Sequence, residues 1–251
     1  MKKIAFLSVL ISLVLISCMP DDNQVNEFSD EVKVSFKFFH TWDSTLVSAT
    51  DFGNLNYTNE NEDVQSITKL RYLISNIMLH NVDGTTVSIK DYQLIDLSQE
   101  GTISFDAEEF VPIGQYNKVS FVFGFNEEDN AQNYPDLNSA NWNWPEMLGA
   151  GYHFMQLEGN YATDNGPQPY AYHNGTARVS EGVFEPNHFT VEISGNFSIT
   201  QVSTITLEMN IAEWFRNPNT WNLHEYNTDL MGNYDAQIMM HENGASVFEK
   251  F

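Results

Sequence analysis

Residues 70–97 read LRYLISNIMLHNVDGTTVSIKDYQLIDL, two apolar-rich runs joined at Asp83-Gly84. The runs over residues 70–82 and 85–97 are rich in β-branched and aromatic residues, which is typical of strands. Asp-Gly readily takes the positive φ angles of a tight primed turn between two strands. The stretch therefore predicts a long β-hairpin, and it makes an all-β fold the expectation for the chain.

Alternation of apolar and polar residues marks further strands. A period of two means that one face of the strand is buried and the other is in water. The apolar rows are Val32, Val34, Phe36 and Phe38; Val119, Phe121, Phe123 and Phe125; and Ile205, Leu207, Met209 and Ile211. Residues 189–199 are a further candidate for a strand pair, with Gly195-Asn196 as a turn or a bulge. Helix is limited to a short segment over residues 211–215, which ends before Asn217-Pro218.

These elements predict one all-β domain over residues 32–251, an antiparallel β-sandwich with long loops and little helix. Three regions lack strand rhythm and are rich in Asn, Asp, Gly and Pro, namely residues 43–68, 126–151 and 161–178. Loops of this length are usually functional or disordered. The second loop carries Trp142 and Trp144 and the third carries Tyr170, Tyr172 and His173, so we expect their aromatic parts to be ordered.

The first residues predict export and lipid anchoring. Lys2-Lys3, an apolar run over residues 4–16 and Ser17-Cys18 form the pattern of a bacterial lipoprotein signal, and Cys18 is the only cysteine. We expect a signal peptide over residues 1–17, lipidation of Cys18 and an acidic flexible tether over residues 18–31. The lipid would anchor the protein in the cell envelope, at the outer membrane, on its periplasmic or surface face. Acidic residues after the cysteine are similar to the surface-export signal of Bacteroidetes lipoproteins.

The chain is strongly acidic. It has 34 Asp and Glu against 11 Lys and Arg, a formal charge of −23, and removal of two lysines with the signal peptide gives −25. Such a field repels polyanions, which argues against nucleic acid as a partner, and it attracts metal cations or a basic protein. Solubility of an envelope protein explains the same charge without any partner.

Standard catalytic motifs are absent from the sequence. It has no HExxH, no GxSxG, no phosphate-binding GxxxxGK, no CxxC and no calcium loop of the D-x-[DN]-x-[DN]-G kind. Acidic pairs such as Glu108-Glu109 are expected to be solvated. We therefore predict a binding protein rather than an enzyme.

Histidines are the candidate metal ligands despite their wide spacing. An isolated histidine is more often structural, but ligands in a sandwich come from distant loops at one end. Imidazole and thioether donors in an aromatic, desolvated pocket suit copper, in particular Cu(I). The seven histidines are His40, His80, His153, His173, His188, His224 and His241.

Four segments, taken together, carry a family resemblance. They are residues 70–77 before the Asp-Gly turn, residues 111–116, Trp142-Asn143-Trp144 with Gly151-Tyr152-His153-Phe154-Met155, and Tyr172-His173-Asn174-Gly175. In this order they resemble the MbnP-like copper-binding family, and the match covers most of the chain from Val32 onward. The resemblance implies a β-sandwich associated with methanobactin copper-uptake systems. Some members bind copper through histidine and a tryptophan that a dihaem cytochrome c peroxidase-like partner oxidises to kynurenine.

The resemblance also implies a site and a function. Trp144 corresponds to the oxidised tryptophan and His173 to a copper ligand. His40 and His241 are weaker matches, included because a strand end and a Met-rich segment could approach the same end of the sandwich. The flanking aromatic residues are Trp142, Tyr152 and Tyr172. The implied function is copper acquisition, storage or handover by an envelope lipoprotein. This chain departs from the family in lacking the cysteines of many relatives and in placing Asn174 after His173.

A second function, from a different class, is surface adhesion or glycan binding. Exposed aromatic faces pack well against sugar rings and partner proteins. The platform would consist of Trp142, Trp144, Tyr152, Tyr170 and Tyr172. Ordinary packing of the two tryptophans onto the sheet explains them equally well. Histidine nitrogens that converge in a buried pocket would favour copper, and outward-facing coplanar rings would favour the platform.

Overall fold

The computed structural model describes residues 30–251. The predicted signal peptide, the lipidated Cys18 and most of the predicted tether lie outside this range. Two β-sheets form a sandwich-like fold with little helix, as the sequence predicts. Among the described residues, no helix has the length and apolarity needed to cross a membrane.

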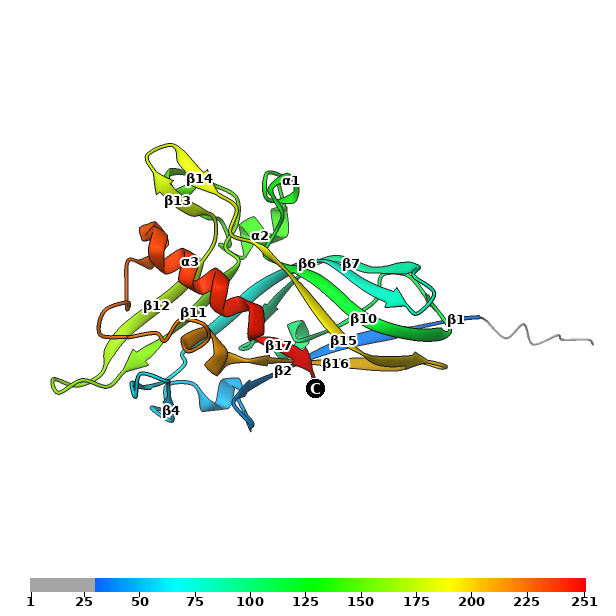
Figure 1. Cartoon of the computed structure of the whole chain (residues 1–251), viewed down its shortest axis with the longest axis horizontal. Helices are drawn as coiled ribbons and strands as arrows, with labels where there is room; N and C mark the ends of the chain where they lie inside the picture. Colours follow the sequence, from blue (N-terminus) through cyan, green and yellow to red (C-terminus); the bar gives the residue numbers. More distant parts are fainter. Residues whose placement is uncertain (1–29) are drawn as a thin grey trace, which may run out of the picture.

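The larger sheet is built around β6, the first arm of the predicted hairpin. β7 pairs with one edge of β6, and β10 and β11 share the other edge. β15 extends the sheet beyond β10 and β12 extends it beyond β11, so the sheet forks, as Figure 1 shows. Its strands are β4 (Tyr57–Thr58), β5 (Val64–Gln65), β6 (Lys69–Asn81), β7 (Thr86–Asp96), β10 (Gly114–Phe123), β11 (Met155–Tyr161), β12 (Gln168–Asn174) and β15 (Phe189–Ile199).

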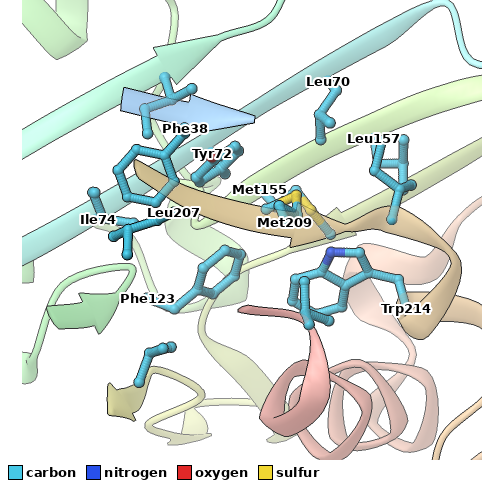
Figure 2. Close-up of a cluster of buried hydrophobic side chains, with 14 of the residues drawn as sticks. Phe38, Leu70, Tyr72, Ile74, Phe123, Met155, Leu157, Leu207, Met209 and Trp214 are labelled. Carbon is cyan, nitrogen blue, oxygen red and sulfur yellow. The ribbon is translucent and has the colours of Figure 1, made fainter. Parts of the chain in front are cut away.

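The smaller sheet packs its apolar face against the larger one. β2 lies at its centre and pairs in parallel with β16, so the sandwich is not purely antiparallel. Figure 2 shows the core between the sheets, where Phe38 and Leu207 lie close to Tyr72 and Ile74. The strands are β2 (Val34–Trp42), β3 (Thr45–Leu46), β8 (Ser104–Asp106), β16 (Ser203–Asn210) and β17 (Phe248–Lys250).

Short elements complete the fold. Two small antiparallel pairs are β1 (Glu31–Val32) with β9 (Val111–Pro112), which are distant in the sequence, and the hairpin of β13 (Ala177–Ser180) with β14 (Val183–Glu185). The α-helices are α1 (Glu127–Asn130), α2 (Pro135–Ser139) and α3 (Tyr234–Asn243). The 3₁₀ helices are η1 (Ala49–Asp51), η2 (Glu100–Thr102), η3 (Glu146–Leu148), η4 (Ile211–Phe215), η5 (Leu230–Gly232) and η6 (Gly244–Ser246).

The hairpin of β6 and β7 is confirmed, but its turn differs from the prediction. Within the turn only Gly84 has a positive φ, of 90°, whereas the type I′ turn typical of Asp-Gly needs a positive φ at both residues. Gly84 N donates to Asn81 O, and Asn81 N donates to Thr85 O. These bonds describe a three-residue loop in which the glycine follows an ordinary turn. Gly195-Asn196 forms a bulge within the single strand β15 and not a turn.

The prediction of a loop over residues 161–178 is wrong, because β12 occupies residues 168–174. Tyr170, Tyr172 and Asn174 alternate inward in this strand and are all buried. Tyrosine and asparagine are not clearly apolar, so the sequence lacks the alternation of apolar and polar residues that Val or Ile at these positions would have given. Pro169 is tolerated because β12 is an edge strand that pairs only with β11.

Candidate functional site

The fork in the larger sheet creates the site. On the edge of β6 opposite β7, the pairing partner changes from β10 to β11 at Leu73. Leu73 O accepts from Gly124 N at the end of β10, and Leu73 N donates to Phe154 O just before β11. Gly124 has φ +85°, and a Cβ there would lie 2.4 Å from the Phe154 ring. Only glycine fits this crossing point. The loop over residues 124–154 therefore starts and ends at one fixed position on the sheet.

The end of this loop folds back as a short hairpin. Asn143 and Tyr152 form an isolated β-bridge, Trp144 N donates to Gly151 O, and His153 N donates to Trp142 O. The turn runs through Gly149, Ala150 and Gly151, all with positive φ. The hairpin thereby places His153 between the two tryptophans of the Trp-Asn-Trp segment.

Four side chains, Trp142, Trp144, His153 and His173, form what we call the His–Trp cluster. The His153 ring centroid lies 4.9 Å from that of Trp144, 5.5 Å from that of Trp142 and 5.3 Å from that of His173. Both tryptophans and His153 are buried, and His173 is partly buried. The cluster joins the loop hairpin to β12, which the sequence separates by about 20 residues.

The orientation of His173 is set by a carboxylate on the neighbouring strand. His173 Nε2 lies 2.9 Å from Glu158 Oε1, and Lys69 Nζ lies 2.7 Å from the same oxygen. The hydrogen bonds from His173 and Lys69 lower the pKa of Glu158 to about 2, so the carboxyl is ionised at neutral pH. Since an ionised carboxylate can only accept, Nε2 carries a proton and donates, so Nδ1 is the ring nitrogen that is not bound to Glu158.

His153 is a neutral imidazole in a desolvated position. Burial, together with the nearby His173 and Arg71, lowers the pKa of His153 to about 3. Its Nδ1 is buried and has no hydrogen-bond partner among the described residues. Buried polar atoms are normally paired, so this unpaired nitrogen marks a place for a ligand.

The two tryptophans are held by specific contacts. Trp144 Nε1 donates to Leu148 O at 3.0 Å, and its indole packs on Gly175, where a Cβ would lie 2.6 Å from the ring. The Arg71 guanidinium lies over Trp142 at 4.9 Å. Glycine is therefore required at position 175, because a larger side chain there would collide with the Trp144 indole.

His173, Trp144 and the flanking Trp142 thus come together, but the other two predicted histidines lie elsewhere. His40 Nε2 lies 3.0 Å from the Tyr72 hydroxyl in the core between the sheets. His241 lies on α3, with its ring 5.3 Å from Phe189 and its Nδ1 3.2 Å from Asn187 O. Within the described range, neither has a ring contact or a hydrogen bond with the cluster.

The hydroxyl groups of the flanking tyrosines are bound to groups outside the His–Trp cluster. Tyr172 neighbours His173 in β12 and therefore faces the opposite side of the sheet, where its hydroxyl donates to Trp214 O. The Tyr152 hydroxyl accepts from Tyr134 N and donates to Asn138 Oδ1. Tyr152 supports the loop through a small apolar cluster with Trp142, Phe125 and Leu137.

The outward-facing aromatic platform of the second hypothesis is not formed by the predicted residues. Trp142, Trp144, Tyr152, Tyr170 and Tyr172 are each at most 3% exposed. Sugar rings cannot stack on faces that are already covered.

The predicted site did not include His153, Glu158 or Lys69, although His153 was among the candidate histidines and in the segment that carries the Trp-Asn-Trp motif. The signal for His153 was the glycine-rich turn at residues 149–151, which folds the chain back so that Tyr152 and His153 pair with Trp142-Asn143-Trp144. The signal for Glu158 was weaker, because it depends on the register of β11 against β12 and β6.

Among the described residues, no three His, Cys, Asp or Glu side chains are grouped so that they could hold a metal ion. A centre of the zinc or calcium kind, with three or more such ligands, is therefore not present in this part of the chain. A site of the His–Trp kind would have to use few ligands.

The geometry defines a class of protein: a two-sheet β-sandwich with a buried histidine–tryptophan cluster on the outer face of one sheet. The family model described as MbnP matches residues 31–239, and the chain belongs to this family. The fold is similar to that of MbnP from Methylosinus trichosporium, with a TM-score of 0.53 and 14% identity, over 76% of this chain and 79% of that one. No curated protein matches the chain.

Proposed function

We propose that this protein binds copper, as Cu(I), between His153 and His173 of the His–Trp cluster. The observation that carries the proposal is the buried, unpartnered Nδ1 of His153, in a ring whose centroid lies 5.3 Å from that of His173. His173 is oriented by Glu158, as histidine ligands of metals usually are by a carboxylate. MbnP family membership fits a methanobactin-associated, copper-related role.

The donor set favours Cu(I) over harder ions. Two imidazoles among indole rings offer nitrogen donors in a desolvated pocket, and imidazole suits copper. Ca²⁺ and Mg²⁺ need several oxygen ligands, which the cluster lacks. Bound copper would supply reversible cargo binding and one-electron redox chemistry. The chain's own part is to keep His153 neutral, to fix the orientation of His173 and to exclude water.

Trp144 is the tryptophan that we propose a dihaem peroxidase-like partner oxidises to kynurenine. It is nearer to His153 than Trp142 is, at 4.9 Å against 5.5 Å between ring centroids. It also packs on Gly175, next to the His173 segment. Trp142 lies under Arg71 and inside the small apolar cluster, where its role is to hold the loop.

The proposed setting is the cell envelope. A lipid on Cys18 would hold the mature chain at the outer membrane, and the chain would acquire, store or hand over copper there without catalysing a reaction. The high negative charge supports a role with cations, because it raises their local concentration.

Metal analysis of single-histidine variants tests the proposal. The mature chain, started at Cys18 and loaded with Cu(I), is expected to hold about one copper per protein. His153→Ala and His173→Ala should each lose it, because two-ligand binding cannot survive the loss of one ligand. His241→Ala is the matched control and should keep the metal. Retention in both cluster variants, with loss in His241→Ala, would contradict the proposed site.

A further inference from the structure

A cleft of about 750 Å³ lies on the other side of the hairpin that carries the cluster. Asn143 and Tyr152 line the cleft, whereas the adjacent Trp144 and His153 belong to the cluster. This follows from strand geometry, in which successive side chains point to opposite faces. The remaining walls come from the α1 and α2 region and from β14, which Figure 1 shows gathered at one end of the molecule. The cleft is within the usual size range of about 300–1,000 Å³ for ligand sites.

One wall of the cleft is a ladder of carboxamides in fixed orientation. Asn143 Nδ2 donates to Asn138 Oδ1 at 2.7 Å, and Asn138 Nδ2 donates to Asn133 Oδ1 at 2.8 Å. Among the described residues, Asn133 Nδ2 and Asn143 Oδ1 make no further hydrogen bond. The ladder therefore ends in an amide group at Asn133 Nδ2 and a carbonyl oxygen at Asn143 Oδ1, the two kinds of partner that a peptide unit requires. Side chains that are already ordered lose little conformational entropy when they bind.

The charged residues of the cleft favour a ligand that carries positive charge. Glu127 and Glu185 line it and are exposed, and no lysine or arginine is among its lining residues. An anionic ligand would meet two carboxylates with no compensating cation. A basic side chain would instead gain charge-assisted hydrogen bonds.

The aromatic lining disfavours a sugar. Phe125, Tyr152 and Phe154 are at most 3% exposed, so they offer no open face for stacking. Phe184 is 38% exposed and provides a single apolar contact at the rim. A peptide needs hydrogen bonds to its backbone and a partner for its side chain, and the cleft supplies both.

We propose that this cleft binds a short extended segment of a partner protein that carries lysine or arginine. The amide ladder holds the backbone, and Glu127 and Glu185 hold the basic side chains. A segment bound there is separated from the His–Trp cluster by one hairpin. This link to copper transfer rests on the proposed function, but the peptide site itself does not.

The test is a calorimetric titration of the metal-free mature chain. The probe is acetyl-Gly-Lys-Ala-Lys-Gly-amide, compared with the same peptide carrying glutamate for lysine and with maltotriose, at about 0.15 M salt to screen distant charges. We expect only the lysine peptide to bind. Since no copper is present, failure of the copper proposal leaves this result unaffected.

Three variants locate the binding. The double variant Glu127→Gln/Glu185→Gln and the cleft-filling Ala131→Trp should each weaken peptide binding by about tenfold or more. Glu60→Gln/Glu62→Gln makes the same charge change in the exposed loop between β4 and β5 and should have little effect. Near-ultraviolet circular dichroism checks that each variant is folded.

Several results would overturn the peptide site. Equal weakening in the control pair would mean that only the overall negative field attracts the peptide. Unchanged binding in Ala131→Trp would place the peptide elsewhere. Binding of maltotriose in place of the lysine peptide would make the cleft a glycan site, and no binding of the lysine peptide would refute the proposal directly.

Discussion

Glu158 gives the proposed copper site its fixed geometry. It accepts from both His173 Nε2 and Lys69 Nζ, so Nδ1 is the nitrogen of His173 that is left for a metal. A ligand whose tautomer and orientation are fixed in advance binds a metal more tightly than a free one. At this scale the site depends on a carboxylate that does not touch the metal.

Glu158→Gln should weaken Cu(I) binding by about tenfold or more, in the range seen for outer-shell changes. The neutral amide still accepts a hydrogen bond, so the fold is retained, but it no longer forces Nε2 of His173 to hold the proton. Competition with a Cu(I) chelator measures the effect. Glu108→Gln, which breaks only the surface pair with Lys90, is the control. Equal affinities for Glu158→Gln and wild type would remove Glu158 from the account.

His40 predicts an acid-sensitive stability. Burial lowers its pKa to about 3, from an ordinary value of 6.5, so the unfolded chain takes up a proton at pH values where the folded chain does not. Stability therefore falls as pH drops below about 6.5, by about 1 kcal/mol between pH 7 and 5.5 from this residue. Urea unfolding at pH 7 and pH 5.5 measures the loss of unfolding free energy between the two pH values. This loss should be smaller by about 1 kcal/mol in His40→Gln than in the wild type. An unchanged drop would mean that His40 is not the neutral buried group described.

At the scale of elements, two glycines allow the loop and the sheet to meet. Gly124 lets β10 end under Phe154, and Gly175 lets the end of β12 approach Trp144. Both contacts join segments that are far apart in sequence. The cluster is therefore a product of packing between the loop over residues 124–154 and β12.

Gly175→Ala tests this packing. The new Cβ would lie 2.6 Å from the Trp144 indole, so Trp144 must move. Overpacking of this kind costs about 1–3 kcal/mol. We expect a lower free energy of unfolding and weaker copper binding together. Gly101→Ala, which meets nothing within 4 Å, should change neither. Wild-type behaviour of Gly175→Ala in both measurements would show that the contact is not close.

Elements with strong alternation could be predicted from sequence, and the others could not. β2, β6, β7, β10 and β16 follow rows of Val, Ile, Leu and Phe, and η4 matches the predicted short helix at residues 211–215. β12 was missed because its inward residues are Tyr and Asn. α3 was missed because its apolar residues form no clear stripe, and its only strong signal is the N-cap Asn233, whose side chain accepts from Ala236 N. The pairing of His153 with His173 depends on strand register, which local patterns do not specify.

At the scale of the whole molecule, one apolar core connects the two sheets. The main buried cluster runs from Val34 in β2 to Val247 near the C-terminus and includes residues of both sheets. The second cluster, around Trp142, is small and lies under the loop. We expect one cooperative unfolding transition of the metal-free chain, with equal calorimetric and van't Hoff enthalpies. Two separate transitions would show that residues 32–251 are more than one domain.

The fork of the larger sheet gives the molecule its functional asymmetry. β10 and β15 form one branch and β11 and β12 the other (Figure 1), and the cluster joins His173 of β12 to the loop between the two branches. The proposed copper site and the proposed peptide cleft both lie where these branches separate. The hairpin at the end of the loop over residues 124–154 faces the proposed copper site on one side and the proposed peptide cleft on the other.

X-ray absorption at the copper edge of the Cu(I)-loaded mature chain tests the central claim most directly. The account predicts a low-coordinate Cu(I) site with imidazole nitrogen ligands, whose signal is lost in His153→Ala and kept in His241→Ala. A spectrum dominated by sulfur, or a nitrogen signal that persists in His153→Ala, would contradict the site described.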